Sequence, residues 1–478
     1  MMTKTNIISH YSQSDLFILL YISAYYLHES SEWINSISSS FSLIILILCL
    51  LTSKYRNYLF IIFLFLSSYF IFDKYPRVAN HSTLIFFVNI YLLFSLLTRK
   101  LLQNDKLIIN GNDFLVLRWS LIIVYFFAGF HKLNYDFLFS VNSCANWFHN
   151  KLFFLLTDQI IKPYPDFIYL ISPIVIVILE ITESLALMFK RTQLIALCSF
   201  ILFHFYLSLG GFVDFASVCF SLMVAFIPSK DFEKYRYIFS QNINLIFVKV
   251  DQLCFYVIGI ILIGLIVYIE RTFNVLQTNN HRYIILISGL LFIVNFIFFS
   301  LFFIKKLYTE KTFVWDSENL FYKIPIQVYT FIILLLVQGS QNYLGLSTAG
   351  TFSMFSNLRT EGGSSNHILL KNNPLEIFPF QKDLVYIDKI DPPYYTINYT
   401  TTNIKNKVIP RVVFEEYLYN IKKLEIPKLD ITLEYNTSKY LEKNILYNSS
   451  WTPHELELKH KILYFRQVHL GNDVQCVW

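Results

Sequence analysis

The sequence is poor in charged residues. Only 15% of its 478 positions are charged, whereas 55% are hydrophobic and 18% are aromatic. A soluble protein of this length carries about a quarter charged residues, so the composition excludes an ordinary soluble globular protein. We therefore expect much of the apolar surface to face membrane lipid.

Other absences narrow the function further. The net charge is +6, but the basic residues occur in pairs between apolar runs rather than in one patch, which argues against a nucleic-acid partner. The six cysteines include no CxxC pair and no zinc-ligand spacing, so we infer no metal site. The first residues lack the charged region, apolar core and cleavage site of a signal peptide, and we expect none to be removed.

Long apolar runs are what the sequence does contain. A membrane-spanning helix needs about 20 mostly apolar residues. These runs predict an all-α polytopic membrane bundle of about 10–11 transmembrane helices within residues 1–338. The predicted spans are 15–28, 37–52, 57–72, 82–98, 114–130, 167–189, 193–209, 212–228, 245–269, 283–304 and 324–338.

The basic residues of the connecting loops predict the orientation. Fifteen lie in one set of alternate loops and seven in the other. Because cytoplasmic loops carry the excess of Lys and Arg, the larger set is predicted to be cytoplasmic. The amino terminus is then cytoplasmic, and the chain after residue 338 is extracytoplasmic or luminal. His81, Lys132 and the turn that holds Gly210, Gly211 and Asp214 all fall on the non-cytoplasmic side.

The chain changes character after Gln338. A polar, turn-rich segment follows, and then short alternating stretches separated by prolines. Three of these stretches are predicted strands: Leu384–Ile387, Tyr394–Tyr399 and Leu429–Tyr435. Residues 339–478 are thus expected to form a β-rich extramembrane domain.

A stretch written YFFAGFHKLNYDF, Tyr125–Phe137, is the most informative part of the chain. The small-residue pair Ala128–Gly129 predicts a tight contact with another helix. Directly afterwards the apolar run ends in polar residues, which are His131, Lys132, Asn134 and Asp136. A titratable group beside a tight helix contact at a membrane surface is a candidate site.

This stretch resembles the end of a helix in the horizontally transferred transmembrane (HTTM) family, which includes the vitamin K-dependent gamma-carboxylase. The family's AG-x-x-KL segment supplies a lysine assigned as catalytic base, and Lys132 is the matching residue. His81, in VANHSTLIF, is similar to the family's NHS-type histidine. The segment SNLRTEGGSSNH, Ser356–His367, is similar to one found after the last span in bacterial members. The family carboxylase has two adjacent lysines where this chain has His131–Lys132.

The resemblance implies a quinol-dependent, gamma-carboxylase-like membrane enzyme. A reduced quinone, such as vitamin K or menaquinol, would be deprotonated and react with oxygen. The strong base so formed would remove a proton from a glutamate of a peptide or protein substrate, which would then capture carbon dioxide. The peptide-recognition region of the family has no match in the carboxyl-terminal domain, so quinone chemistry can be retained without carboxylation.

Lys132 has two interpretations on chemical grounds. A lysine at a helix end is commonly an anchor that extends its charge to the membrane surface. As a catalytic base it needs a partly desolvated amine, because burial favours the neutral form. His81 likewise either tolerates water at a helix start or orients an oxygen of the same quinone.

Three ionisable residues lie inside predicted spans. His204 is either a catalytic histidine or an interior one bonded to a neighbouring helix. Glu180 and Glu183 are three residues apart, so they share one helix face and each needs a partner or a proton. Lys132 and His204 are the candidate partners. We assign Glu180 and Glu183, with His131 and Asn134, to cofactor binding.

The Ser356–His367 segment is either structural or a lid over the site. Arg359 and Glu361 could pair with each other or with a substrate group, and with His367 they are the residues we expect to dock the substrate. The same glycine-containing segment follows the last predicted span, on the side of Lys132.

Cys144 and Cys476 are the cysteines outside the apolar runs, and both fall on the outer face. They form either a disulfide, if that compartment is oxidising, or two free thiols.

Two other classes of function remain open. A transporter or channel would use Glu180, Glu183 and His204 as a buried relay. A non-enzymatic membrane partner or assembly protein would act through residues 339–478.

Overall fold

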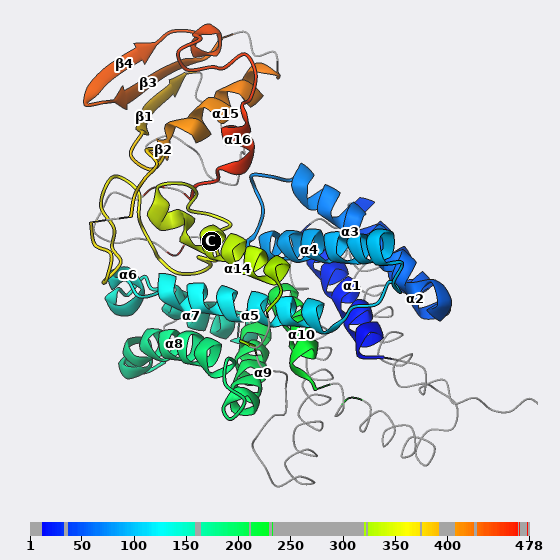
Figure 1. Cartoon of the computed structure of the whole chain (residues 1–478). Coiled ribbons are helices and arrows are strands. Elements are labelled where there is room, and N and C mark those ends of the chain that lie inside the picture. The colour runs from blue at the N-terminus through cyan, green and yellow to red at the C-terminus, as the bar shows by residue number, and fades with distance from the viewer. Residues whose placement is uncertain are drawn as a thin grey trace, which may run out of the picture.

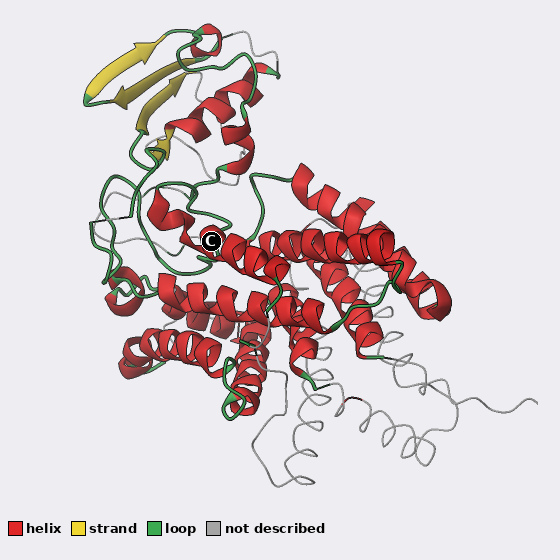
Figure 2. Cartoon of the chain, viewed as in Figure 1, coloured by secondary structure: helices red, strands yellow, loops and turns green. Residues whose placement is uncertain are grey.

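A computed structural model describes most of the chain (Figures 1 and 2). The described residues are 12–32, 37–157, 164–209, 212–228, 232, 320–321, 324–372, 375–391, 407–424, 428–466, 468 and 476. Helices form one large body, and a small sheet lies at one end of it (Figure 2).

The helical body contains the elements from α1 to α10 and α14. Their bounds are α1 Gln13–Glu32, α2 Ile37–Leu51, α3 Arg56–Asp73, α4 Asn80–Gln103, α5 Gly111–His131, α6 Tyr135–Phe139, α7 Cys144–Thr157, α8 Asp166–Ala186, α9 Gln193–Leu209, α10 Val213–Met223 and α14 Ile326–Leu344. Short 3₁₀ turns, Ser53–Tyr55 and Val224–Phe226, precede α3 and follow α10.

Four of the described helices have the length and composition of membrane-spanning helices. The stretches Ser53–Asp73, Asn80–Gln103, Gly111–His131 and Asp166–Ala186 are long and apolar enough to cross a bilayer. The shorter predicted spans are also helical, but 245–269 and 283–304 lie outside the described residues. The membrane assignment therefore rests on these four helices, and the number and orientation of the spans stay predictions.

Helix α5 is the centre of the bundle. It is 83% buried over its apolar window, whereas the other three long apolar helices are 28–39% buried. Its neighbours in the fold are α4, α8, α10 and α14. A helix that is apolar on every side needs protein or lipid on every side. Here protein surrounds α5, while α3, α4 and α8 expose large apolar side chains such as Phe65, Phe94 and Leu170.

The start of α5 is set by local chemistry. The Asn110 side chain accepts hydrogen bonds from the backbone nitrogens of Asn112 and Asp113. In turn, the Asp113 carboxylate accepts a hydrogen bond from the Asn110 nitrogen. This reciprocal cap satisfies nitrogens that the first turn leaves without partners. The cap therefore fixes where α5 begins, and Lys132 follows its last turn.

The small sheet has four antiparallel strands in the order β2-β1-β3-β4. Their bounds are β1 Leu384–Asp391, β2 Lys407–Pro410, β3 Asp430–Tyr435 and β4 Ser438–Glu442. Two of the predicted strands thus correspond to β1 and β3, and Tyr394–Tyr399 lies outside the described residues. Val385, Ile387, Ile431 and Leu433 alternate along the two strands and fill one face.

The carboxyl-terminal region is less purely β-structured than the strand patterns indicated. Helix α15, Arg411–Lys422, packs on the sheet through Phe414, Tyr417, Leu418 and Ile421, and a short helix α16, Leu458–Ile462, contacts it. The spacing of those four apolar residues is helical. Helix α14 also continues to Leu344, beyond the predicted domain boundary at residue 338.

Candidate active site at the end of helix α5

Lys132 forms a buried ion pair with Glu180. The Lys132 Nζ atom lies 2.8 and 3.0 Å from the two carboxylate oxygens, and the side chains are 6% and 7% exposed. Nζ also donates to the carbonyl of Ala128, one turn back on α5, at 3.2 Å. Lys132 is therefore directed into the protein toward α8, and a snorkelling anchor at the lipid surface is excluded. Lys132 and His204 were the candidate partners of the two glutamates, and Glu180 pairs with Lys132.

Glu183 lies one turn further along α8 and has a different partner. Its Oε1 atom accepts a short hydrogen bond from the Ser199 hydroxyl on α9. Its Oε2 atom is buried and has no hydrogen-bond partner within the described part of the chain. Both glutamates thus face the interior, as their spacing predicted, but they belong to separate hydrogen-bond networks.

His204 is a hydrogen-bonded interior residue. Its Nδ1 atom donates to the Phe200 carbonyl at 2.8 Å, and its Nε2 atom accepts a short hydrogen bond from the Tyr125 hydroxyl. The Tyr125 oxygen is also 3.0 Å from the Cys219 sulfur. Tyr125 lies on the same helix as Lys132, about two turns before it.

His81 belongs to a third group of contacts. Its Nε2 atom is 2.8 Å from Nδ1 of His28 and 3.4 Å from Oδ2 of Asp214. These three residues come from the starts of α4 and α10 and the end of α1. The predicted turn residues Gly210 and Gly211 lie outside the described residues. Asp214, three positions after Gly211, lies 3.4 Å from His81, so two of the predicted features do meet.

One aromatic ring links His81 to His204. The Phe215 ring centroid lies 6.1 Å from that of His81, 5.8 Å from that of His204 and 6.0 Å from that of Tyr125. The rings of both predicted catalytic histidines thus lie near one phenyl ring. The charged partner of Lys132 is Glu180, whereas His81 contacts His28 and Asp214.

No protein-family model, curated protein or solved structure matches the chain. The functional argument for this protein therefore depends on its own residues.

His131 and Asn134 have their hydrogen-bonding groups engaged by the fold. His131 lies between the Tyr343 hydroxyl, 2.8 Å from Nδ1, and the Thr351 carbonyl, 3.2 Å from Nε2. The Asn134 amide donates to the carbonyls of His131 and Ser356, and its oxygen caps α6 at Phe137. Both residues hold the turn around Lys132, and cofactor binding by them stays a prediction.

The predicted lid segment packs directly on this turn. Leu133 accepts a hydrogen bond from the Ile368 nitrogen at 2.9 Å, and Tyr135 donates one to the Asn366 carbonyl at 3.1 Å. The His367 Nε2 atom donates to the Phe130 carbonyl at 3.0 Å. Burial holds the pKa of His367 below its usual value, although the bond to Phe130 acts in the opposite direction. A neutral His367 ring thus covers the end of α5.

The segment contains two charged residues, Arg359 and Glu361. Glu361 is buried and accepts a hydrogen bond from the Thr360 nitrogen at 3.0 Å. Its charge acts on Arg466, whose pKa burial lowers and Glu361 raises in part. Arg359 is half-buried. Glu361 thus interacts with groups of the protein itself. Substrate docking by Arg359 and Glu361 stays a prediction.

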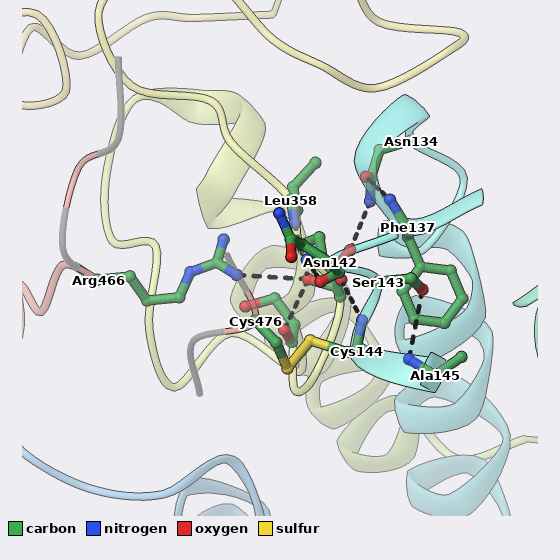
Figure 3. The surroundings of a disulfide bond; sticks show 12 residues. Asn134, Phe137, Asn142, Ser143, Cys144, Ala145, Leu358, Arg466 and Cys476 are labelled. Carbon is green, nitrogen blue, oxygen red and sulfur yellow. Dashed lines mark hydrogen bonds between the residues drawn. A yellow bond between two sulfur atoms is a disulfide. The ribbon is translucent and has the colours of Figure 1, made fainter. Parts of the chain in front are cut away.

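A disulfide joins Cys144, at the start of α7, to Cys476 (Figure 3). Their Cα atoms are 4.9 Å apart although 332 positions separate them in the sequence. Near the bond, Arg466 Nη1 donates to the Ser356 hydroxyl at 3.3 Å, and the Asn357 oxygen accepts from the Cys144 nitrogen at 2.8 Å. The carboxyl terminus is thus tied to the segment that covers the Lys132 turn. Of the two states left open for these cysteines, the structure has the bonded one.

Several residues of this region were not singled out from the sequence. Tyr125, Ser199 and Cys219 lie inside apolar runs, where a single hydroxyl or thiol gives little signal. His28 had a clearer one, because His28–Glu29 places two ionisable groups at the end of the first apolar run. Ionisable residues at such positions are uncommon and usually have partners.

Proposed function

We propose that the chain is an integral membrane enzyme in which the Lys132–Glu180 pair takes a proton from a reduced, lipid-soluble quinone. The observation that carries the proposal is the ion pair itself, buried at the end of the central helix with Nζ–O distances of 2.8 and 3.0 Å. Buried ion pairs contribute little stability compared with well-packed apolar residues, so such a pair asks for another explanation.

The geometry of the pair suits proton transfer. The Lys132 amine donates hydrogen bonds to both Glu180 oxygens, so a proton can pass between the two groups along an existing hydrogen bond. Glu180 can therefore hold the proton that Lys132 releases, without exchange with solvent. The neutral amine then accepts a phenolic proton, and the Glu180 oxygens remain its hydrogen-bond acceptors.

The surroundings of Lys132 suit a ring carried in lipid. Leu133, Phe137, Val177 and Ile181 belong to one apolar cluster, and Nζ lies 5.8 Å from the Phe137 ring centroid. A lipid-soluble hydroquinone would supply the redox chemistry, by reacting with oxygen to give the strong base that the HTTM resemblance implies. Tyr125, which is hydrogen-bonded to His204, lies about two turns before Lys132 on α5 and belongs to a separate network.

The remaining parts of the proposal follow from the same resemblance. The acceptor would be a glutamate of a peptide or protein, carboxylated with carbon dioxide, on the extracytoplasmic side of the membrane. The Cys144–Cys476 disulfide supports that orientation, because disulfides persist in oxidising compartments.

The test uses full-length protein reconstituted in liposomes with reduced menaquinone and bicarbonate. Lys132→Ala and the charge-neutral double variant Lys132→Met/Glu180→Gln should each lose at least ~100-fold in quinone oxidation, the scale of an acid–base group. Lys74→Met is the matched control, because it removes another lysine that pairs with a buried glutamate, Glu29, at 2.8 Å. Equal turnover by the wild type, the double variant and Lys74→Met would end the proposal.

One observation favours a second function. The buried Glu183 has an oxygen without a hydrogen-bond partner in the described residues, and such a carboxyl group suits a proton relay. A transporter would lose flux in Glu183→Gln and keep it in Lys132→Ala. The same liposomes, loaded with a pH-sensitive dye, distinguish this pattern from the enzymatic one.

A further inference from the structure

Two imidazoles and a carboxylate converge where the ends of three helices meet. His28 comes from α1, His81 from α4 and Asp214 from α10, and α1 packs directly along α10 (Figure 1). One ligand-type atom of each residue lies within 4.8 Å of the other two. We call this set the His28–His81–Asp214 cluster.

The separations within the cluster fit the coordination sphere of a metal ion. They are 2.8 Å between His28 Nδ1 and His81 Nε2, 3.4 Å from His81 Nε2 to Asp214 Oδ2, and 4.0 Å from His28 Nδ1 to Asp214 Oδ2. Ligand bonds of about 2.1 Å at tetrahedral angles separate two donor atoms by about 3.4 Å. The three separations bracket that value, so one ion could bind all three atoms after small side-chain movements.

Neighbouring groups already orient the ligands. The second nitrogen of the His28 ring, Nε2, is 2.7 Å from the Ser82 hydroxyl. Metal-binding histidines and carboxylates usually have outer partners of this kind, which fix the ring and leave one nitrogen for the ion. The other nearby carboxylate, Glu29, is taken up by Lys74 and Ser38.

We propose that the His28–His81–Asp214 cluster binds a divalent transition-metal ion of the Zn²⁺ or Fe²⁺ class. Two imidazoles and one carboxylate suit these ions, whereas Ca²⁺ and Mg²⁺ prefer oxygen ligands and Cu⁺ prefers sulfur. Three protein ligands leave at least one coordination position for water or a substrate oxygen, which is the arrangement of catalytic rather than structural sites.

The proposal goes beyond the sequence expectation, which assigned no metal. That expectation rested on cysteine spacing and motif spacing, and these ligands are 53 and about 130 positions apart along the chain, at ends of different helices. It also stands apart from the proposed function, because neither Lys132 nor Glu180 is a ligand. Its readout is metal binding, so either proposal can fail alone.

The first experiment uses the purified full-length protein in detergent, stripped with a chelator and titrated with Co²⁺. We expect one Co²⁺ per chain, with the visible absorption of a four- or five-coordinate ion. X-ray absorption at the zinc edge of the Zn²⁺-loaded wild type should then count two imidazole ligands. Weak binding well below one ion per chain, or a spectrum with no imidazole contribution, would overturn the proposal.

Variants assign the site to these residues. His81→Ala and the conservative Asp214→Asn should abolish the stoichiometric Co²⁺ spectrum. Ser82→Ala, which removes only the partner of His28, should weaken binding by ~10- to 100-fold. The matched control is His149→Ala, whose ring bonds Ser172 and Tyr206 instead. Co²⁺ binding that is the same in wild type, Asp214→Asn and Ser82→Ala would place the ion elsewhere and sink the proposal.

Discussion

Gly129 on α5 lies directly against Glu180 on α8. A Cβ atom added at Gly129 would stand 3.0 Å from the Cβ of Glu180 and 2.7 Å from Cγ1 of Ile181. Such distances are shorter than real carbon contacts, so only glycine permits this approach of the two helices. The approach brings the Glu180 carboxylate within reach of Lys132, one turn away.

Gly129→Ala should therefore push α8 away from α5. We expect a loss of about 1–3 kcal/mol in the free energy of unfolding, as for other additions to a packed core, and a longer Lys132–Glu180 contact. Thermal unfolding of the detergent-purified protein measures the loss. The control is Thr182→Ala on the exposed face of α8, which should change stability by less than ~0.5 kcal/mol. Equal melting of wild type and Gly129→Ala would contradict the close packing.

Removing one member of the ion pair should cost more than removing both charges. Lys132→Met leaves the Glu180 carboxylate buried without its partner, so we expect a loss of about 3–5 kcal/mol. In Lys132→Met/Glu180→Gln no charge remains, and much of that loss should be recovered. Unfolding of the single and double variants in one thermodynamic cycle measures the coupling. Additive effects of the two changes would show that the groups do not act as a pair.

Acid should loosen the segment that covers the Lys132 turn. His367 has a lowered pKa in the folded protein, so below about pH 6.5 the unfolded chain binds a proton that the folded chain does not. The contribution of the neutral His367 ring to the free energy of unfolding is therefore complete above pH 6.5. It is lost as the pH falls toward the pKa of His367 in the folded protein. Protonation would also displace the Leu369 and Leu370 nitrogens, both 3.2 Å from Nδ1.

The comparison of wild type with His367→Gln isolates this residue from the other histidines. We expect the stability difference between the two proteins to shrink as the pH falls from 7.5 to 5, by up to about 1.4 kcal/mol per pH unit. Amide exchange of the peptide that contains Leu369 should rise over the same range in the wild type. A stability difference that is independent of pH would contradict a buried neutral ring.

The disulfide should be a major contribution to the stability of the carboxyl-terminal region. Loss of a native disulfide typically costs about 2–5 kcal/mol, and this one closes a loop with a sequence separation of 332. Cys144→Ser should lower the melting temperature as much as Cys476→Ser, and the double variant should be no worse. Cys198→Ser is the control, because Cys198 is a free cysteine. Mass spectrometry of unreduced peptides must also find the Cys144–Cys476 link.

The sequence was most informative about single helices. Apolar length predicted the long helices, and Ala128–Gly129 predicted a tight contact that Gly129 now makes with α8. The rule that buried charges need partners also limited Glu180 to Lys132 or His204. It could not choose between them, because the choice depends on how α5, α8 and α9 pack, and no local pattern encodes that packing.

The meeting of His28 with His81 was not predicted for the same physical reason. His28 and His81 meet only because α1 and α4 bring their ends together, and motif spacing does not describe such meetings. Helix α15 is a second difference, because the strand patterns predict only strands on both sides of Pro410. In the structure Pro410 is the last residue of β2 and the residue that precedes the first turn of α15.

The contacts of the α5 end also bear on biosynthesis. Phe130 and Leu133 bond through their carbonyls to His367 and Ile368, residues that leave the ribosome more than 200 positions later. Helix α5 can thus enter the bilayer long before those donors exist. A chain that stops near residue 350 would lack these donors, so the turn that holds Lys132 is complete only once residues 366–368 are in place.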